Sequence, residues 1–172
     1  MTTNRIHIFR EIVIVLVLSL VFVSSISIKT VNAQAGQVTL KPSDDTYVDS
    51  SNPNSNYGGQ TDLEVEYWVF GSSPYQDIVW LKFDLSTIPN GAVIDGATLS
   101  LYTFIVGETF NVYACYCSDN PWTELGITWV NYPRIGFISV DSVSVATPDK
   151  WYNWNVSGAI KYTQDNARAN PK

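Results

Sequence analysis

Two tryptophans and two charged residues have a spacing that could form a surface for a flat, hydroxylated ligand. Glu66 and Trp68 are two residues apart, and so are Trp80 and Lys82. Side chains two apart in a β-strand share a face, so each pair would lie on one surface. Indole rings stack on apolar ring faces such as those of sugars, while charged groups hydrogen-bond hydroxyls. With Tyr102 as an extension, we predict a ligand-binding surface; the alternative is a packing surface covered by a loop or another domain.

A predicted hairpin determines which side chains share that surface. Residues 62–68 and 78–85 alternate apolar and polar side chains, which predicts two strands joined by a loop centred near Pro74. We expect the register in which every inner pair is apolar. The inner pairs are Tyr67 with Leu81, Val65 with Phe83, and Leu63 with Leu85. This register places Trp68 opposite Trp80, and Glu66 opposite Lys82, on the outer side.

Acidic residues near the start of the domain are candidate ligands for a hard cation. Asp44, Asp45 and Asp49 lie close together in sequence, and Asp62 and Asp84 follow on the predicted strands. Calcium prefers several carboxylate and carbonyl oxygens, so a structural calcium at Asp44, Asp45 and Asp49 is one hypothesis. No segment matches an EF-hand loop. The alternative is a set of solvated acidic turns.

Groups suited to enzyme chemistry are scarce. The only histidine, His7, lies in a predicted targeting segment, so no imidazole is expected in the mature chain. Glu124 with Asp119 resembles the paired carboxylates of a glycosidase, but spacing in a loop fixes neither their separation nor a raised pKa. We therefore predict no catalytic residue and no enzyme activity.

Two short motifs concern covalent chemistry. Cys115 and Cys117 are two apart in an apparent strand, which puts both on one face with poor geometry for a mutual disulfide. We expect two free thiols, with a bridge to another chain as the alternative. Asn155-Val-Ser157 is the only N-glycosylation sequon, and chance accounts for it equally well.

The N-terminus has the pattern of an export signal. Arg5 and Arg10 precede an uncharged apolar run over residues 12–23, and Val31-Asn-Ala33 offers a cleavage site. We predict a signal peptide over 1–33, with a retained membrane anchor as the alternative. Its removal would take three of ten basic and one of sixteen acidic residues, changing the net charge from −6 to −8. Without a basic stripe, nucleic acid is not an expected partner and anionic glycans are disfavoured.

Short alternating runs between turn residues predict an all-β fold in one domain over residues 34–172. The only helical periodicity lies near residues 157–165. Loops are expected at 51–59, 88–91 and 119–121. The predicted strands are 37–40, 62–68, 78–85, 97–103, 110–116, 138–145 and 151–156.

Several motifs together resemble one known family. They are Tyr47-Val-Asp49, Asn56-Tyr-Gly58, residues 81–89, residues 92–102, residues 122–133 and residues 151–157. In this combination the chain resembles the DNRLRE, or disaggregatase-related, family, which includes modules like those of carbohydrate-binding module family 96. The resemblance implies an antiparallel, jelly-roll-like β-sandwich. It also implies that residues 122–133 fold over one end of the sandwich and that a further strand or two follow the region ending near residue 162, so we expect the domain over 34–172 to be truncated and to lack its final strands.

The predicted function combines the resemblance with the aromatic surface. We expect a secreted, non-catalytic module that binds an extracellular or cell-surface polysaccharide for adhesion or targeting. A neutral or mixed glycan suits the acidic chain better than a strongly anionic one. The alternative is a structural surface or matrix subunit that self-associates through an open sheet edge, as in donor-strand assembly.

Overall fold

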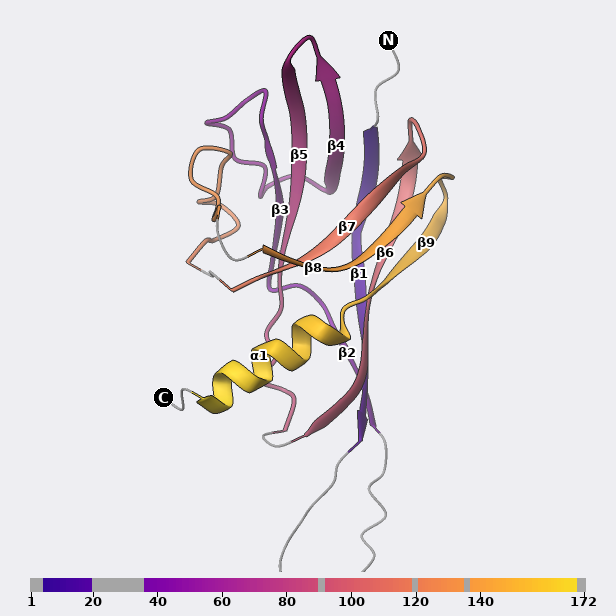
Figure 1. The fold of residues 1–172 in the computed structure, drawn as a ribbon, viewed down its shortest axis with the longest axis vertical. Coiled ribbons are helices and arrows are strands. Elements are labelled where there is room, and N and C mark those ends of the chain that lie inside the picture. Colours follow the sequence, from indigo (N-terminus) through magenta and orange to yellow (C-terminus); the bar gives the residue numbers. More distant parts are fainter. Residues whose placement is uncertain (1–4, 20–35, 90–91, 119–120, 135–136, 170–172) are drawn as a thin grey trace, which may run out of the picture.

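The protein is an antiparallel β-sandwich with one helix in its described part, as a computed structural model shows (Figure 1). The structure describes residues 5–19, 36–89, 92–118, 121–134 and 137–169. Its elements, in chain order, are β1 (Arg5–Ser19), β2 (Gly36–Leu40), β3 (Asp44–Asp49), β4 (Asp62–Phe70), β5 (Ser73–Lys82), β6 (Val93–Val106), β7 (Phe110–Cys117), β8 (Phe137–Val145), β9 (Lys150–Asn155) and α1 (Ser157–Ala169). The predicted all-β class is confirmed. The helix is longer than the predicted periodicity indicated.

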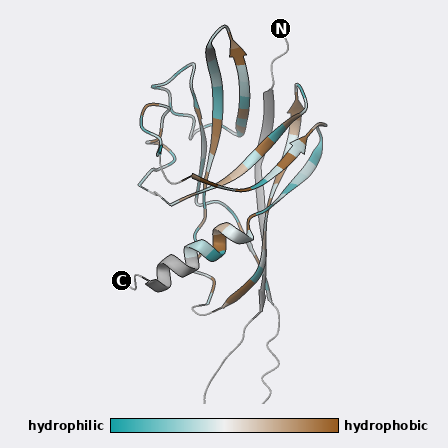
Figure 2. Ribbon diagram, in the orientation of Figure 1, coloured by the Kyte–Doolittle hydropathy of each residue, from teal (hydrophilic) through white to brown (hydrophobic). Residues whose placement is uncertain are grey.

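The strands form two sheets of unequal size. The larger one has seven strands in the order β3-β5-β4-β1-β6-β9, with β2 pairing on β1, and every pairing is antiparallel. The smaller sheet consists of β7 and β8. Alternating hydrophobic and hydrophilic bands are visible along β4 and β5 (Figure 2), as expected for strands whose two faces meet different surroundings.

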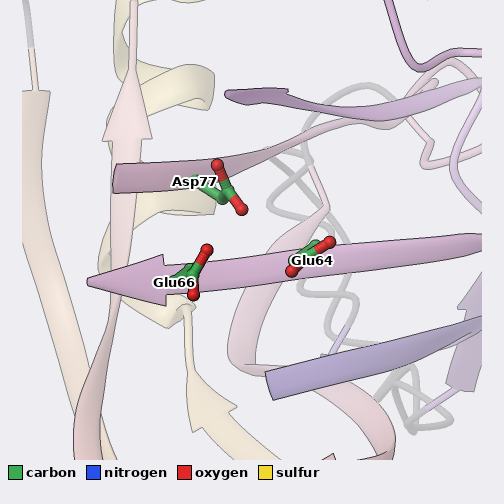
Figure 3. A group of neighbouring side chains, drawn as sticks. All are labelled: Glu64, Glu66 and Asp77. Atoms are coloured by element: carbon green, nitrogen blue, oxygen red, sulfur yellow. The ribbon is translucent and has the colours of Figure 1, made fainter. Parts of the chain in front are cut away.

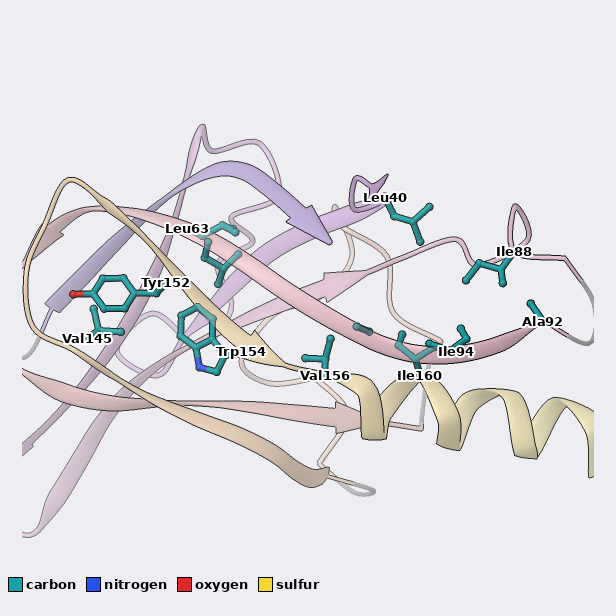
Figure 4. Close-up of a cluster of buried hydrophobic side chains, with 12 residues drawn as sticks. Leu40, Leu63, Ile88, Ala92, Ile94, Val145, Tyr152, Trp154, Val156 and Ile160 are labelled. Carbon is teal, nitrogen blue, oxygen red and sulfur yellow. The ribbon is translucent and has the colours of Figure 1, made fainter. Parts of the chain in front are cut away.

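The main core lies between the larger sheet, the smaller sheet and the start of α1 (Figure 4). Trp154 of β9 is almost fully buried, and its indole Nε1 donates a hydrogen bond to the Val112 carbonyl of β7 over 2.8 Å. That bond ties the two sheets together while satisfying a buried donor. The buried residues of this cluster are Leu40, Leu63, Ile88, Ala92, Ile94, Ala97, Leu101, Val145, Tyr152, Trp154, Val156 and Ile160.

A second buried cluster closes one end of the larger sheet. We call it the end cluster: Val48 of β3, Trp80 of β5, and Trp122 and Ile127 of the segment between β7 and β8. The Trp80 and Trp122 rings meet edge to face, with centroids 5.8 Å apart. Residues 122–133 therefore cover an end of the sheet, as the family resemblance implied.

The β4–β5 hairpin has a different register from the predicted one. Tyr67 pairs with Gln76, five residues from the predicted Leu81, and Trp68 pairs with Tyr75. The strands meet at a two-residue loop, in which Gly71 has a positive φ of 64°. Glycine at the first position of a two-residue loop suits the tight hairpin turns whose twist matches that of the strands. The predicted loop near Pro74 is wrong, because Pro74 lies within β5 opposite Val69.

The error in register also reverses which side chains share a face. A shift by an odd number of residues exchanges the two faces of one strand relative to the other. Leu63 and Val65 therefore share a face with Trp80, not with Phe83 and Leu85. Leu63 is buried as predicted, while the other three are partly buried against the main core.

Candidate functional site

The opposite face of β4 and β5 carries an aromatic pair beside three carboxylates. Trp68 of β4 and Tyr75 of β5 are cross-strand partners, and their rings stack with centroids 4.1 Å apart and planes within 6°. We call these two residues the aromatic pair. Phe70 meets the Trp68 ring edge-on at 6.2 Å. The two rings come from neighbouring strands and stack face to face, so one face of each ring points away from the other ring.

The carboxylates come from the same two strands. Glu66 and Asp77 form the next cross-strand pair on this face, two residues from the aromatic pair, and Glu64 follows along β4. One oxygen from each of the three lies within 4.8 Å of the others (Figure 3). Glu64 and Asp77 are buried, and Glu66 is partly exposed. We call this set the carboxylate trio.

The trio can bind hydroxyl groups or a hard cation. Ionised carboxylates are strong hydrogen-bond acceptors, and several carboxylate oxygens are what calcium prefers. Burial, followed by the negative charge of Glu64, raises the pKa of the nearby Tyr47 phenol. The Tyr47 phenol therefore stays neutral and remains able to donate a hydrogen bond.

A second aromatic contact lies further along the same sheet. Tyr102 of β6 and Trp151 of β9 are cross-strand partners whose rings meet edge to face at 5.5 Å. Tyr102 and Asp62 both pair in register with Phe9 of β1, which places Tyr102 on the face of the carboxylate trio. Trp151 is 42 % exposed.

Three of the five predicted ligand residues lie on this face, namely Glu66, Trp68 and Tyr102. Trp80 and Lys82 lie on the other face, so the predicted pairs Trp68–Trp80 and Glu66–Lys82 are wrong. Trp80 is only 5 % exposed, within the end cluster. Its Nε1 has no hydrogen-bond partner among the described residues.

The Lys82 side chain contacts the loop that carries Trp122. Its Nζ donates to the Trp122 carbonyl and lies 4.5 Å from the centre of the Trp122 ring. Asp44 is 4.0 Å from the same Nζ. Lys82 therefore holds the Trp122 loop against the strands through a hydrogen bond and a cation–π contact, and it forms an ion pair with Asp44 of β3.

The structure separates the three predicted calcium ligands. Asp44 and Asp45 are adjacent in β3, so they point to opposite faces. Asp44 Oδ1 accepts a hydrogen bond from the Glu124 amide over 3.2 Å. The Asp49 carboxylate accepts hydrogen bonds from residues of the loop that follows β3. The carboxylate trio, which sequence reasoning missed, brings acidic oxygens together instead. Calcium stays a prediction, and a thermal melt unchanged by a chelator would dispose of it.

Asp49 organises the loop after β3. Its Oδ1 accepts bonds from the Ser51 amide and hydroxyl, both at 2.6 Å, and its Oδ2 accepts from Asn52 Nδ2 at 2.7 Å and Tyr57 Oη at 2.9 Å. Burial raises the pKa of Asp49, but bonds from Asn52, Ser51 and Tyr57 outweigh it and lower the pKa to about 2. The Tyr57 ring in turn stacks on Tyr47 at 4.3 Å.

The same loop is fastened to the Trp122 loop. Asn56 Nδ2 donates to the carbonyls of Glu124 at 2.8 Å and Ile127 at 2.7 Å. A Cβ on Gly58 would lie closer than 3.0 Å to the Glu124 carbonyl oxygen. The motif Asn56-Tyr-Gly58 thus has a structural role, and the Glu124 backbone is part of it. Asp119, the suggested catalytic partner of Glu124, lies outside the described residues.

The remaining predicted sites have simple surroundings. Cys115 and Cys117 form no disulfide with each other or with another described residue. Asn155 is exposed, and its Oδ1 accepts bonds from the Ser157 amide at 3.1 Å and hydroxyl at 2.7 Å. This turn begins α1, so the sequon residues help to start the helix. Glycosylation at Asn155 stays a prediction.

Two shallow hollows of the described surface lie away from the aromatic pair. One, of about 300 Å³, is lined by residues of β7, β8 and α1, including Tyr116, Ile138 and Tyr162. The other, of about 290 Å³, lies beside Trp122 and Asn131. Both are smaller than or at the lower limit of typical small-molecule sites.

Comparison with known proteins identifies the family. The family model for carbohydrate-binding module family 96 matches residues 36–170, which is most of the chain. The chain belongs to this family, and its fold and family together define a carbohydrate-binding module. Searches among curated proteins and among solved structures found no match. In the part of the chain that the structure describes, no helix is long and apolar enough to cross a membrane.

Proposed function

We propose that the protein is an exported, non-catalytic module that binds extracellular or cell-surface polysaccharide through the face carrying Trp68. The observation that supports this most is the stacked pair of Trp68 and Tyr75, held beside the carboxylate trio on adjacent strands. Stacked rings offer apolar surface for sugar C–H groups, and carboxylates accept hydrogen bonds from sugar hydroxyls. Family membership supplies the ligand class.

The charge of this face favours a neutral or mixed glycan. Three carboxylates lie within 4.8 Å of one another next to the aromatic pair, and the whole chain has a net charge of −6. A uronate or sulfate brought to this position would be repelled by like charge. Lys82, the cation predicted for this surface, is bound to the Trp122 loop on the other face.

The test compares a partly exposed aromatic residue of the larger sheet with an exposed one of the smaller sheet. The full chain, Trp68→Ala and Tyr113→Ala are measured for binding to a panel of neutral and acidic polysaccharides. Tyr113 is 62 % exposed on β7 and serves as the matched control. We expect Trp68→Ala to weaken binding roughly 30-fold, which corresponds to about 2 kcal/mol for a central aromatic contact. Tyr113→Ala should bind as the unmodified chain does.

Three results would contradict the proposal. Equal losses in both variants would show that the Trp68 face has no special role. Absence of binding to every polysaccharide, together with a particle mass that rises with concentration, would instead favour the alternative of a self-associating structural subunit. Turnover of any polysaccharide would contradict the non-catalytic role.

A further inference from the structure

The centre of the larger sheet is occupied by a strand from outside the matched module. β1 comprises Arg5–Ser19, whereas the family match begins at residue 36. β1 nevertheless lies between β4 and β6, pairing with β4 over residues 5–9 and with β6 over most of its length (Figure 1). β4 and β6 are not hydrogen-bonded to each other in the sheet order. Without β1, the larger sheet would separate into β3-β5-β4 and β6-β9, and β2 would lose its pairing with β1.

The register of β1 matches the chemistry of its neighbours on the core side. Ile8 pairs with Leu63 and Thr103, both almost fully buried, and Ile12 pairs with Leu101, which is 5 % exposed. Apolar residues of β1 thus fall opposite buried positions of β4 and β6. Cross-strand neighbours of this kind stabilise a sheet.

The register matches on the acidic side as well. Arg5 pairs with Glu66, and His7 pairs with Glu64. Basic residues directly across from acidic ones are favourable neighbours in an antiparallel pair. The two basic residues of β1 that pair with β4 therefore fall opposite its two glutamates.

We propose that the gap between β4 and β6 is a strand-acceptor site, and that its occupant is Arg5–Ser19 of the same chain, retained in the folded protein. An open gap would leave two rows of unpaired backbone groups, which is costly and invites pairing with other chains. The predicted removal of residues 1–33 and this pairing exclude each other in one molecule. The same apolar segment thus supplies an export-signal pattern and a central strand.

The first experiment cuts the chain between β1 and β2 without removing β1. A specific protease site is placed between residues 24 and 30 of the full chain, and the folded protein is cut and run on gel filtration. We expect both pieces to co-elute at monomer mass and to separate in urea. An N-terminal piece that elutes alone, with the remainder melting at the temperature of the uncut chain, would overturn the proposal. A dimer in which the strand crosses between copies would also overturn it.

A proline variant tests the backbone pairing itself. Val15 pairs with Thr39 of β2 and Thr98 of β6, so Val15→Pro removes an amide donor from a central strand. It should lower the melting temperature of the full chain by roughly 10 °C and release the N-terminal piece after the cut. Thr3→Pro, before β1, is the control and should do neither. Equal behaviour of the two variants would contradict the proposal.

The mass of the exported protein provides the second test. Retention of β1 predicts the full 19.2 kDa chain in the extracellular fraction. A chain lacking residues 1–33 would overturn retention. Both tests are independent of glycan binding, so their failure would leave the proposed function standing.

Discussion

Trp80 and Trp68 lie on neighbouring strands, yet they belong to two different regions of the molecule. Trp80 is 5 % exposed and packs in the end cluster against Trp122. Trp68 is partly exposed and stacks on Tyr75 on the opposite face. The residue type is the same, and strand register alone decides which face each indole takes. One tryptophan therefore serves stability, and the other is the one to which the proposed function assigns ligand contact.

The largest expected effect is on the end cluster. Trp80→Ala should destabilise the protein by about 3–5 kcal/mol, as large-to-small changes of buried aromatics do. Trp80→Phe should cost less, because it keeps an aromatic ring and removes an N–H that has no partner among the described residues. Denaturant unfolding measures both. A Trp80→Ala loss below about 1 kcal/mol would contradict the burial of Trp80.

The attachment of the two loops gives the next largest effect. Gly58→Ala should cost about 1–3 kcal/mol, because the new Cβ would lie closer than 3.0 Å to the Glu124 carbonyl oxygen. Gly59→Ala is the matched control, since a Cβ added there would have nothing within 4 Å. Thermal unfolding compares the two variants. Equal melting temperatures would show that the loops are not in close contact.

Tyr75 tests the aromatic pair separately from stability. Tyr75→Ala should weaken glycan binding about 10-fold, or roughly 1.4 kcal/mol, because Trp68 loses the ring that holds it in place. Tyr75→Phe keeps the stacked ring and should bind nearly as well. Isothermal titration calorimetry with the best polysaccharide from the panel provides the affinities. If Tyr75→Phe loses as much as Tyr75→Ala, the hydroxyl and not the stacked ring is what matters.

Asp49 provides the smallest effect, visible as a pH dependence. Its pKa is lowered to about 2 from the ordinary value of 3.8, so its contribution to stability is complete above that ordinary value. The contribution is lost as the pH falls through the folded-state pKa. Asp49→Asn should therefore flatten the decline in unfolding free energy between about pH 4 and pH 2.

Asp84 is the control for this pH dependence. Its carboxylate also accepts bonds from Ser86, and its pKa is lowered, but it lies at the surface. Asp84→Asn should change the decline less than Asp49→Asn does. If the unfolding free energy of Asp49→Asn falls with pH as steeply as that of the unmodified chain, the loop does not hold this carboxylate ionised.

The fold could be predicted from the sequence more fully than the site. Alternation and turn residues located seven strands, because both signals are local. The β4–β5 register was wrong, because two registers place apolar residues opposite one another and only the turn distinguishes them. Gly71-Ser72 was the available signal for a two-residue loop. The carboxylate trio depends on that register, since Asp77 meets Glu66 only after the hairpin is correctly paired.

Some features could not be predicted from local patterns at all. The roles of Asn56 and Gly58 depend on a loop almost seventy residues away, whose carbonyls Asn56 binds. The position of β1 between β4 and β6 joins residues far apart in sequence, and a leader-like composition gave no indication of it. Tyr102 was placed correctly, because outward alternation on β6 is a local property.

The most direct test of the central claim is an NMR titration that observes the indole N–H signals of all six tryptophans. Neutral polysaccharide fragments are added to the labelled full chain, with signals assigned by single Trp→Phe variants. The account predicts that the Trp68 signal shifts progressively, while those of buried Trp80, Trp122 and Trp154 stay in place. Shifts of Trp122 or Trp129 without a change at Trp68 would place the ligand at the loop end and contradict the account.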